Sequence, residues 1–126
     1  MNDMAGTGAV AYEPTGADAF SNPIGMAIDS QDRIYVCDSS NDRIVRINDI
    51  TGAGRVQFGT EGSGEQEFSF PDGIAVDSAF HIYITDVGNS CVVKVDDMTG
   101  AGWTALASRG KGDGEFMDPI GVAIKE

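Results

Sequence analysis

The feature that most constrains the fold of this chain is a 48-residue internal repeat. Residues 23–70 align without a gap on residues 71–118 and share 19 identities in 48 positions. The same spacing relates Pro23, Pro71 and Pro119, and also Gly25, Gly73 and Gly121. Self-similarity at a fixed period is typical of solenoids and propellers, in which each repeat is one structural unit packed against its neighbours. These prolines and glycines are therefore predicted to be structural positions of the repeat.

Each repeat is predicted to contain four short strands, because runs of about five residues rich in β-branched and aromatic side chains alternate with turn-forming segments. Residues 59–70 and 107–118 are predicted to be longer loops that lead into the next repeat. No apolar pattern with a period of 3.6 is long enough to indicate a helix. The predicted strands are residues 24–28, 33–37, 43–47 and 55–58 in the first repeat, and 73–76, 81–85, 91–95 and 103–106 in the second.

Four-stranded antiparallel units that recur every 40–50 residues or so are typical of β-propeller blades, so we expect an all-β fold. The pattern of residues 23–29, Pro-x-Gly-x-Ala-x-Asp, is followed by Ile-Tyr-x-x-Asp-x-x-Asn at residues 34–41, and both recur 48 residues later. These residues resemble the NHL repeat. The resemblance covers the chain from Phe20 onward and implies a propeller of five or six blades. An Arg that usually follows the Asn is present as Arg43, but Cys91 takes its place in the second repeat.

The length of the chain corresponds to about 2.6 repeats, fewer than the roughly 4–8 blades of a propeller ring. We expect an incomplete ring in one chain, with two full blades and a partial blade at each end. Residues 1–22 would supply an outer strand, near residues 8–12, and a connecting loop. Residues 119–126 would supply an inner strand. Residues 23–70 and 71–118 would each form a blade with its loop.

Composition excludes several classes of function. The net charge of -12 opposes nucleic acid, because binding to a phosphate backbone depends on Lys and Arg. No apolar run approaches the ~18 residues of a membrane span, so no membrane partner is expected. No signal peptide is visible in residues 1–10, which slightly favours a cytoplasmic location. Cys37 and Cys91 are too few for a disulfide framework and are interpreted as buried thiols.

The candidate binding residues lie in the loops between the second and third strands: Asp38, Asn41, Asp86 and Asn89. In a propeller these loops share one rim with the long loops between blades. The four side chains could line a binding surface or offer oxygen ligands to Ca²⁺. They could equally close their own hairpins through backbone hydrogen bonds, as Asp and Asn often do. No calcium-loop motif is present, and no metal or cofactor is expected.

Other chemical candidates are weaker. His81 is the single histidine and is expected at the opposite rim, whereas zinc sites and catalytic triads usually need further partners. The glycine-rich long loops lack the Gly-Lys-Ser/Thr run and following helix of a phosphate loop. Trp103 is expected to pack on an outer strand. No catalytic residue is therefore predicted.

We expect a non-catalytic propeller unit that serves as a binding and assembly scaffold and completes its propeller by self-association. Three copies would supply six full blades, and an unidentified protein or small ligand is a further expected partner. Two alternatives stay open. Some propellers that resemble NHL proteins are metal-dependent lyases or hydrolases, and the chain could also be a fragment of a larger NHL protein.

Overall fold

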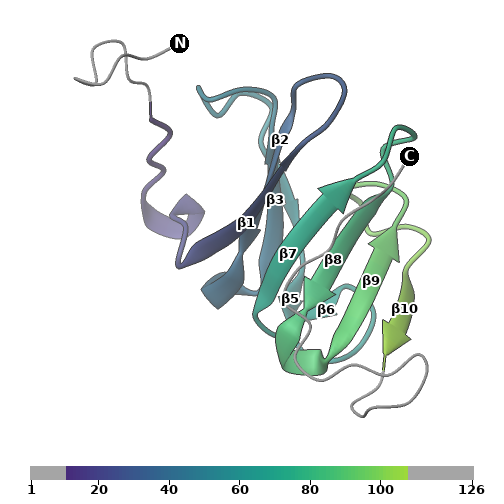
Figure 1. Ribbon diagram of the computed structural model, residues 1–126. Helices are drawn as coiled ribbons and strands as arrows, with labels where there is room; N and C mark the ends of the chain where they lie inside the picture. The colour runs from purple at the N-terminus through teal and green to yellow at the C-terminus, as the bar shows by residue number, and fades with distance from the viewer. Residues whose placement is uncertain (1–10, 108–126) are drawn as a thin grey trace.

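The structure is a computed structural model, and it describes residues 11–107. Two four-stranded antiparallel sheets form its all-β architecture, and each corresponds to one repeat (Figure 1). We call them blade 1 and blade 2. Blade 1 contains Pro23–Ile28 (β1), Ile34–Asp38 (β2), Arg43–Ile47 (β3) and Val56–Phe58 (β4). Blade 2 contains Pro71–Val76 (β7), Ile82–Asp86 (β8), Cys91–Val95 (β9) and Thr104–Ala107 (β10).

Each blade pairs its strands in chain order, from β1 to β4 and from β7 to β10, as the predicted hairpins require. The inner strand of each blade carries a bulge near its start, between Pro23 and Met26 in β1 and between Pro71 and Gly73 in β7. Proline has no backbone N–H to donate to a strand ladder, and strand prolines lie at the first residue or at a bulge. The fold class and the eight blade strands predicted from the repeat are therefore confirmed.

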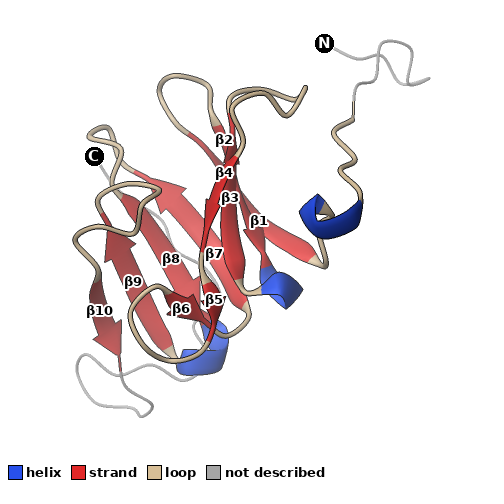
Figure 2. Ribbon diagram, turned by 180° about the vertical axis from the view of Figure 1, so that it is seen from behind, coloured by secondary structure: helices blue, strands red, loops and turns tan. Residues whose placement is uncertain are grey.

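Short helical turns occupy two of the predicted hairpin loops. Ser39–Asn41 (η2) joins β2 to β3, and Val87–Asn89 (η3) joins β8 to β9. The residue after each turn, Asp42 or Ser90, has a left-handed backbone with φ of 55°. Figure 2 shows both turns at one end of the sheets, with a third turn, Gly16–Asp18 (η1), ahead of β1. None of the helices in residues 11–107 has the length and apolar character needed to cross a membrane.

The long loop between the blades differs from the sequence prediction, and the two predicted terminal strands lie largely outside the described residues. The long loop at residues 59–70 is not wholly irregular, because Thr60–Glu61 (β5) and Glu67–Phe68 (β6) form a small parallel ladder. The ladder closes the loop on itself between the two blades. Ala11 and Tyr12, the described end of the outer strand expected near residues 8–12, are not in a strand. The rest of that segment and the inner strand expected in residues 119–126, with Pro119 and Gly121, lie outside the described residues.

The hydrophobic core lies between the two sheets. Along a strand, side chains alternate between the two faces of the sheet. Tyr35, Cys37 and Ile44 project from blade 1 toward blade 2, whose Ile74 and Ile84 face them. The inner strands β1 and β7 are in contact at the centre (Figure 1). Each blade thus buries one apolar face against the other, and the two blades do not close a ring.

Candidate functional site

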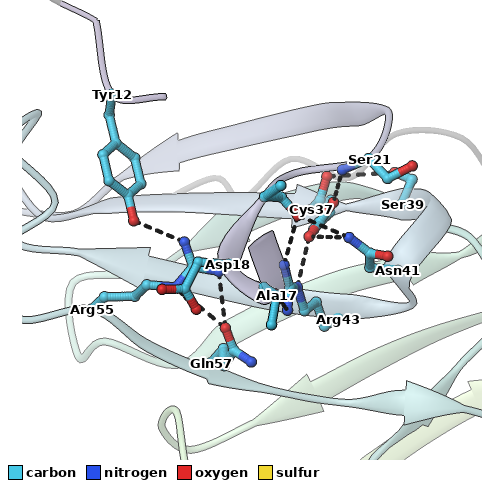
Figure 3. A network of polar contacts seen from close by, with 12 residues as sticks. Tyr12, Ala17, Asp18, Ser21, Cys37, Ser39, Asn41, Arg43, Arg55 and Gln57 are labelled. Atoms are coloured by element: carbon cyan, nitrogen blue, oxygen red, sulfur yellow. Dashed lines mark hydrogen bonds and ion pairs between the residues drawn. The ribbon is translucent and has the colours of Figure 1, made fainter. Parts of the chain in front are cut away.

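The rim that carries η2 and η3 is organised around two buried carboxylates, Asp38 and Asp86. Asp38 ends β2, and its carboxylate accepts hydrogen bonds from the Ser21 backbone N–H at 2.7 Å and from Asn41 Nδ2 at 2.9 Å. Arg43 Nε completes the set at 2.6 Å (Figure 3). The burial of an ionised carboxylate is costly unless it is paired and hydrogen-bonded, and Asp38 has both kinds of partner.

Arg43 extends this network to the segment that precedes β1. Its Nη1 and Nη2 atoms donate to the carbonyl oxygens of Ala17 at 3.1 Å and Ala19 at 2.9 Å. Asn41 Nδ2 also lies 3.1 Å from the Ala19 carbonyl. The guanidinium thus lies between the Asp38 carboxylate and the backbone of η1, and Figure 3 shows Arg43 beside Ala17. The Asp-x-x-Asn-x-Arg pattern of the first repeat therefore ties the incoming chain to the end of the sheet.

In blade 2 the equivalent carboxylate, Asp86, lacks the arginine that pairs with Asp38. Asp86 accepts hydrogen bonds from Ser69 N and Asn89 Nδ2, each at 2.8 Å, but Cys91 replaces the arginine. Within residues 11–107 no Lys or Arg pairs with Asp86. Burial raises the pKa of Asp86 to about 6, because the two hydrogen bonds only partly offset desolvation and the nearby Asp42 carboxylate adds repulsion. The two repeats thus share a loop geometry but differ in charge.

A shallow polar cavity of about 310 Å³ opens on this rim beside Asn89. Asn89 Nδ2 also donates to the Gly62 carbonyl at 2.7 Å, which joins the η3 turn to the long loop between the blades. Of the four predicted binding residues, the structure brings Asn89 to a hollow, leaves Asn41 exposed and buries Asp38 and Asp86. A ligand-binding role for the four stays a prediction. The cavity is lined by Glu61, Gly62, Ser63, Ser69 and Asn89.

The opposite rim repeats a second polar arrangement. Asp29 Oδ2 accepts hydrogen bonds from Arg33 Nε at 2.7 Å and from the Tyr35 hydroxyl at 2.8 Å. Burial favours a higher pKa for Asp29, but hydrogen bonds from Arg33, Tyr35 and Gln31 outweigh it and lower the pKa below its usual value. In blade 2 His81 stands in the place of Arg33, with its Nδ1 atom 3.0 Å from Asp77 Oδ2.

The remaining candidates are the two cysteines, possible groups of metal ligands and Trp103. Cys37 and Cys91 are buried free thiols, and burial raises the pKa of Cys91 to about 11, so its reactive thiolate is scarce near neutral pH. Among residues 11–107 no group of three His, Cys, Asp or Glu side chains could hold a metal ion. Trp103 lies just before β10 and packs on Phe68, with ring centroids 5.4 Å apart.

A third surface is apolar and was not singled out from the sequence. The side chains of Ile24, Met26 and Ile28 project from β1 on the side away from blade 2, and we call this surface the β1 face. Met26 is 64% exposed, whereas Ile74, which occupies the equivalent position of blade 2, is 7% exposed beneath blade 1. The sequence does carry a signal for this surface, because β1 has apolar residues on both of its sides. A strand of this kind is usually buried on both faces of its sheet.

A cavity of about 390 Å³ lies at the base of the β1 face. It is mostly apolar, and Phe20 and Val36 extend it beyond β1 itself. Cavities of this kind, with hydrophobic lining and few polar groups, usually accept apolar groups of a ligand or partner. The lining residues are Phe20, Pro23, Ile24, Gly25, Met26 and Val36.

Four-stranded antiparallel sheets that recur at 48 residues and bury their faces against each other define the chain as a protein of β-propeller blades. The family model for the NHL repeat matches residues 20–47 and 68–95, so the chain contains two NHL repeats, as the resemblance implied. Each match runs from the residues before the inner strand to the end of the third strand. No curated protein matches the chain.

Proposed function

We propose that this chain is a non-catalytic binding and assembly scaffold of the propeller type, which completes its propeller by association with further copies of itself. The single observation that carries this proposal is the exposed β1 face. In blade 2 the equivalent face is buried beneath blade 1, so the repeat itself indicates what kind of surface belongs there. A blade needs neighbours on both sides to bury its apolar sheet.

Burial of a Leu, Ile or Met side chain contributes about 1.5–3 kcal/mol, so coverage of Ile24, Met26 and Ile28 would favour association by several kcal/mol before the costs of association are subtracted. Exposed apolar side chains gathered on one strand are typical of interaction surfaces. The side chains of Ile24, Met26 and Ile28 are at least 50% exposed, whereas the buried residues of the core are 9% exposed or less.

A second binding surface is the rim beside Asn89. The polar cavity there has donors and acceptors from Asn89, Ser69 and the glycine-rich loop, and it could accept a polar group of a protein or small ligand. Asp86 fixes the loop from beneath through Ser69 and Asn89. In this proposal the rim binds partners and the β1 face assembles the propeller.

Light scattering during gel filtration tests the assembly. Native protein should elute at a multiple of 13.2 kDa, with about 40 kDa for three copies. Met26→Asp places a charge on the β1 face and should yield a species of about 13 kDa. Ile50→Asp is the matched control, because Ile50 is an exposed apolar residue of the β3–β4 turn, outside that face. A native protein that stays monomeric across micromolar to millimolar concentration would refute self-association.

A further inference from the structure

Blade 1 shows how the repeat binds a cation at the η2 and η3 rim. The Arg43 guanidinium donates to the Asp38 carboxylate and to the carbonyl oxygens of Ala17 and Ala19. Only 11% of the Arg43 side chain is exposed. The planar guanidinium has several N–H donors in a fixed arrangement, which suits a carboxylate flanked by backbone oxygens. In blade 1 the rim is therefore a guanidinium site that the chain fills with its own arginine.

The acceptor groups of this site recur in blade 2, 48 residues later, without the cation. Asp86 is the equivalent carboxylate, and Glu65 and Glu67 carry the equivalent carbonyl groups. Cys91 takes the place of Arg43. Every residue that the repeat assigns to the site lies within residues 11–107, where no Lys or Arg pairs with Asp86. Among these residues blade 2 thus has an uncompensated buried carboxylate where blade 1 has an ion pair.

The loops that lead into the two blades share a turn at this point. The backbone N–H of Ala19 donates to the carbonyl oxygen of Gly16 at 3.1 Å, and that of Glu67 donates to Gly64 at 3.2 Å. In blade 2 the turn lies next to the polar cavity of about 310 Å³, because Gly62 lines that cavity. The backbone arrangement of the site is therefore present in blade 2, with a hollow beside it.

The cavity is surrounded by negative charge. Glu61 lines it and is exposed. Glu67 folds back toward Gly62, and its Oε1 atom accepts a hydrogen bond from the Gly64 N–H at 2.8 Å. Asp86 lies beneath the lining, and the two loops that form the cavity contain no Lys or Arg. A concave surface of one sign of charge attracts ligands of the opposite sign.

The spacing of these carboxylates favours an organic cation over a metal ion. Within the described part of the chain no group of three His, Cys, Asp or Glu side chains could hold a metal. A guanidinium spreads its charge over a planar group and can contact acceptors that are further apart than the ligands of one ion. The acceptors and the charge thus fit the group that blade 1 binds.

We infer that this cavity binds the guanidinium group of an arginine side chain of a partner protein, which supplies to blade 2 the charge that Arg43 supplies to blade 1. The inference rests on the proposed role of the rim as a binding surface and names the chemistry of its partner. Glu61 would accept hydrogen bonds from the guanidinium, and Asp86 would stabilise its charge from beneath through Asn89 and Ser69.

The shape of the cavity indicates a protein as the source of the arginine. Pockets for small molecules enclose most of the ligand surface, whereas this cavity is shallow. An arginine that projects from a protein surface needs only such a hollow, and arginine is enriched at protein interfaces. The net charge of -12 also favours encounter with a basic partner.

An NMR titration with the peptide Gly-Gly-Arg-Gly-Gly, followed at the Asn89 side-chain amide, tests the inference. It is made at low salt and near pH 7.5, above the pKa of about 6 of Asp86. The native protein should bind with a dissociation constant on the order of 1 mM. The same peptide with citrulline in place of arginine has a similar shape without the charge and should bind about tenfold more weakly or not at all.

Three variants locate the site. Glu61→Gln and Asp86→Asn should each weaken binding of the arginine peptide by about three- to tenfold. Cys91→Arg supplies the cation within the chain and should reduce binding by more than about tenfold. Asp32→Asn is the matched control, because it removes one exposed charge at the opposite rim and should leave the affinity unchanged. Circular dichroism checks that each variant folds.

The contrary results are distinguishable. If the citrulline peptide binds as tightly as the arginine peptide, the rim remains a binding surface but recognition of a guanidinium is refuted. If N-acetyl-arginine amide binds and the peptide does not, the partner is a small molecule and the inference is overturned. Unchanged affinity in Glu61→Gln and Cys91→Arg would place the arginine elsewhere. If no arginine compound binds, the inference fails, whereas self-association is measured separately by light scattering and can still stand.

Discussion

The close approach of β1 and β7 makes Gly25→Val the most informative single substitution. The new Cβ atom would overlap the carbonyl oxygen of Asp72 and lie 3.1 Å from its carbonyl carbon. The obstacle is backbone of the neighbouring inner strand and cannot rotate away. Valine otherwise suits a strand, so the substitution isolates the steric effect.

The expected magnitude follows from two opposing terms. Overpacking of a filled interior costs roughly 1–3 kcal/mol, and a branched side chain against backbone belongs near the upper end of that range. Replacement of glycine within a strand recovers about 0.5–1 kcal/mol of conformational entropy. We therefore expect Gly25→Val to lower the free energy of unfolding by about 2 kcal/mol, a large part of the stability of a small protein.

Urea denaturation followed by Trp103 fluorescence measures this change. Trp103 is the single tryptophan and packs on Phe68 in the core between the blades. The midpoint should fall with an unchanged slope, at one protein concentration, because association would shift apparent stability.

The control is Gly64→Val, where the new Cβ atom would meet only the end of the Glu67 side chain, at 3.0 Å, in an exposed loop. It should change the stability by less than ~0.5 kcal/mol, the usual range at the surface. If Gly25→Val has an effect that small, the two inner strands are not packed as closely as the structure indicates.

Three further predictions concern the carboxylates of the η2 and η3 rim. Arg43→Ala should destabilise the protein by about 3–5 kcal/mol in urea denaturation, because it leaves the fully buried Asp38 without its cation; a loss below ~1 kcal/mol would contradict that pairing. Asp86 has a folded-state pKa of about 6, above the ~3.9 of an unfolded chain, so its contribution to stability should be largest below pH ~4 and should fall as the pH rises to about 6; Asp86→Asn should remove that fall, and an unchanged profile would refute it. Cys91→Arg should restore the cation of blade 1 and lower the pKa of Asp86, which carboxyl NMR titration measures directly; a pKa that stays near 6 would show that the guanidinium does not reach the carboxylate.

The repeat predicted where the residues of the candidate site lie, but it did not predict their burial or their contacts. The pattern placed Asp38, Asn41, Asp86 and Asn89 at one rim, because equivalent loops of repeated blades lie at the same end. It did not show that the carboxylates are buried while Asn89 borders a cavity. Burial depends on the segments that cross over each loop, such as residues 17–21 above Asp38, and these are distant in sequence. The substitution of Arg43 by Cys91 was visible in the sequence, but its electrostatic consequence required the geometry.

The sequence by itself determined the architecture of this protein. A period of 48 residues, four strand-forming runs in each period and turn residues between them specify four-stranded blades, because each of these signals is local in the chain. Only the tertiary structure decided which apolar residues are covered. Met26 and Ile74 are equivalent in sequence, yet one is exposed and the other buried. Burial is a property of neighbours in space, and blade 1 covers one face of blade 2 while its own β1 face remains open to a partner.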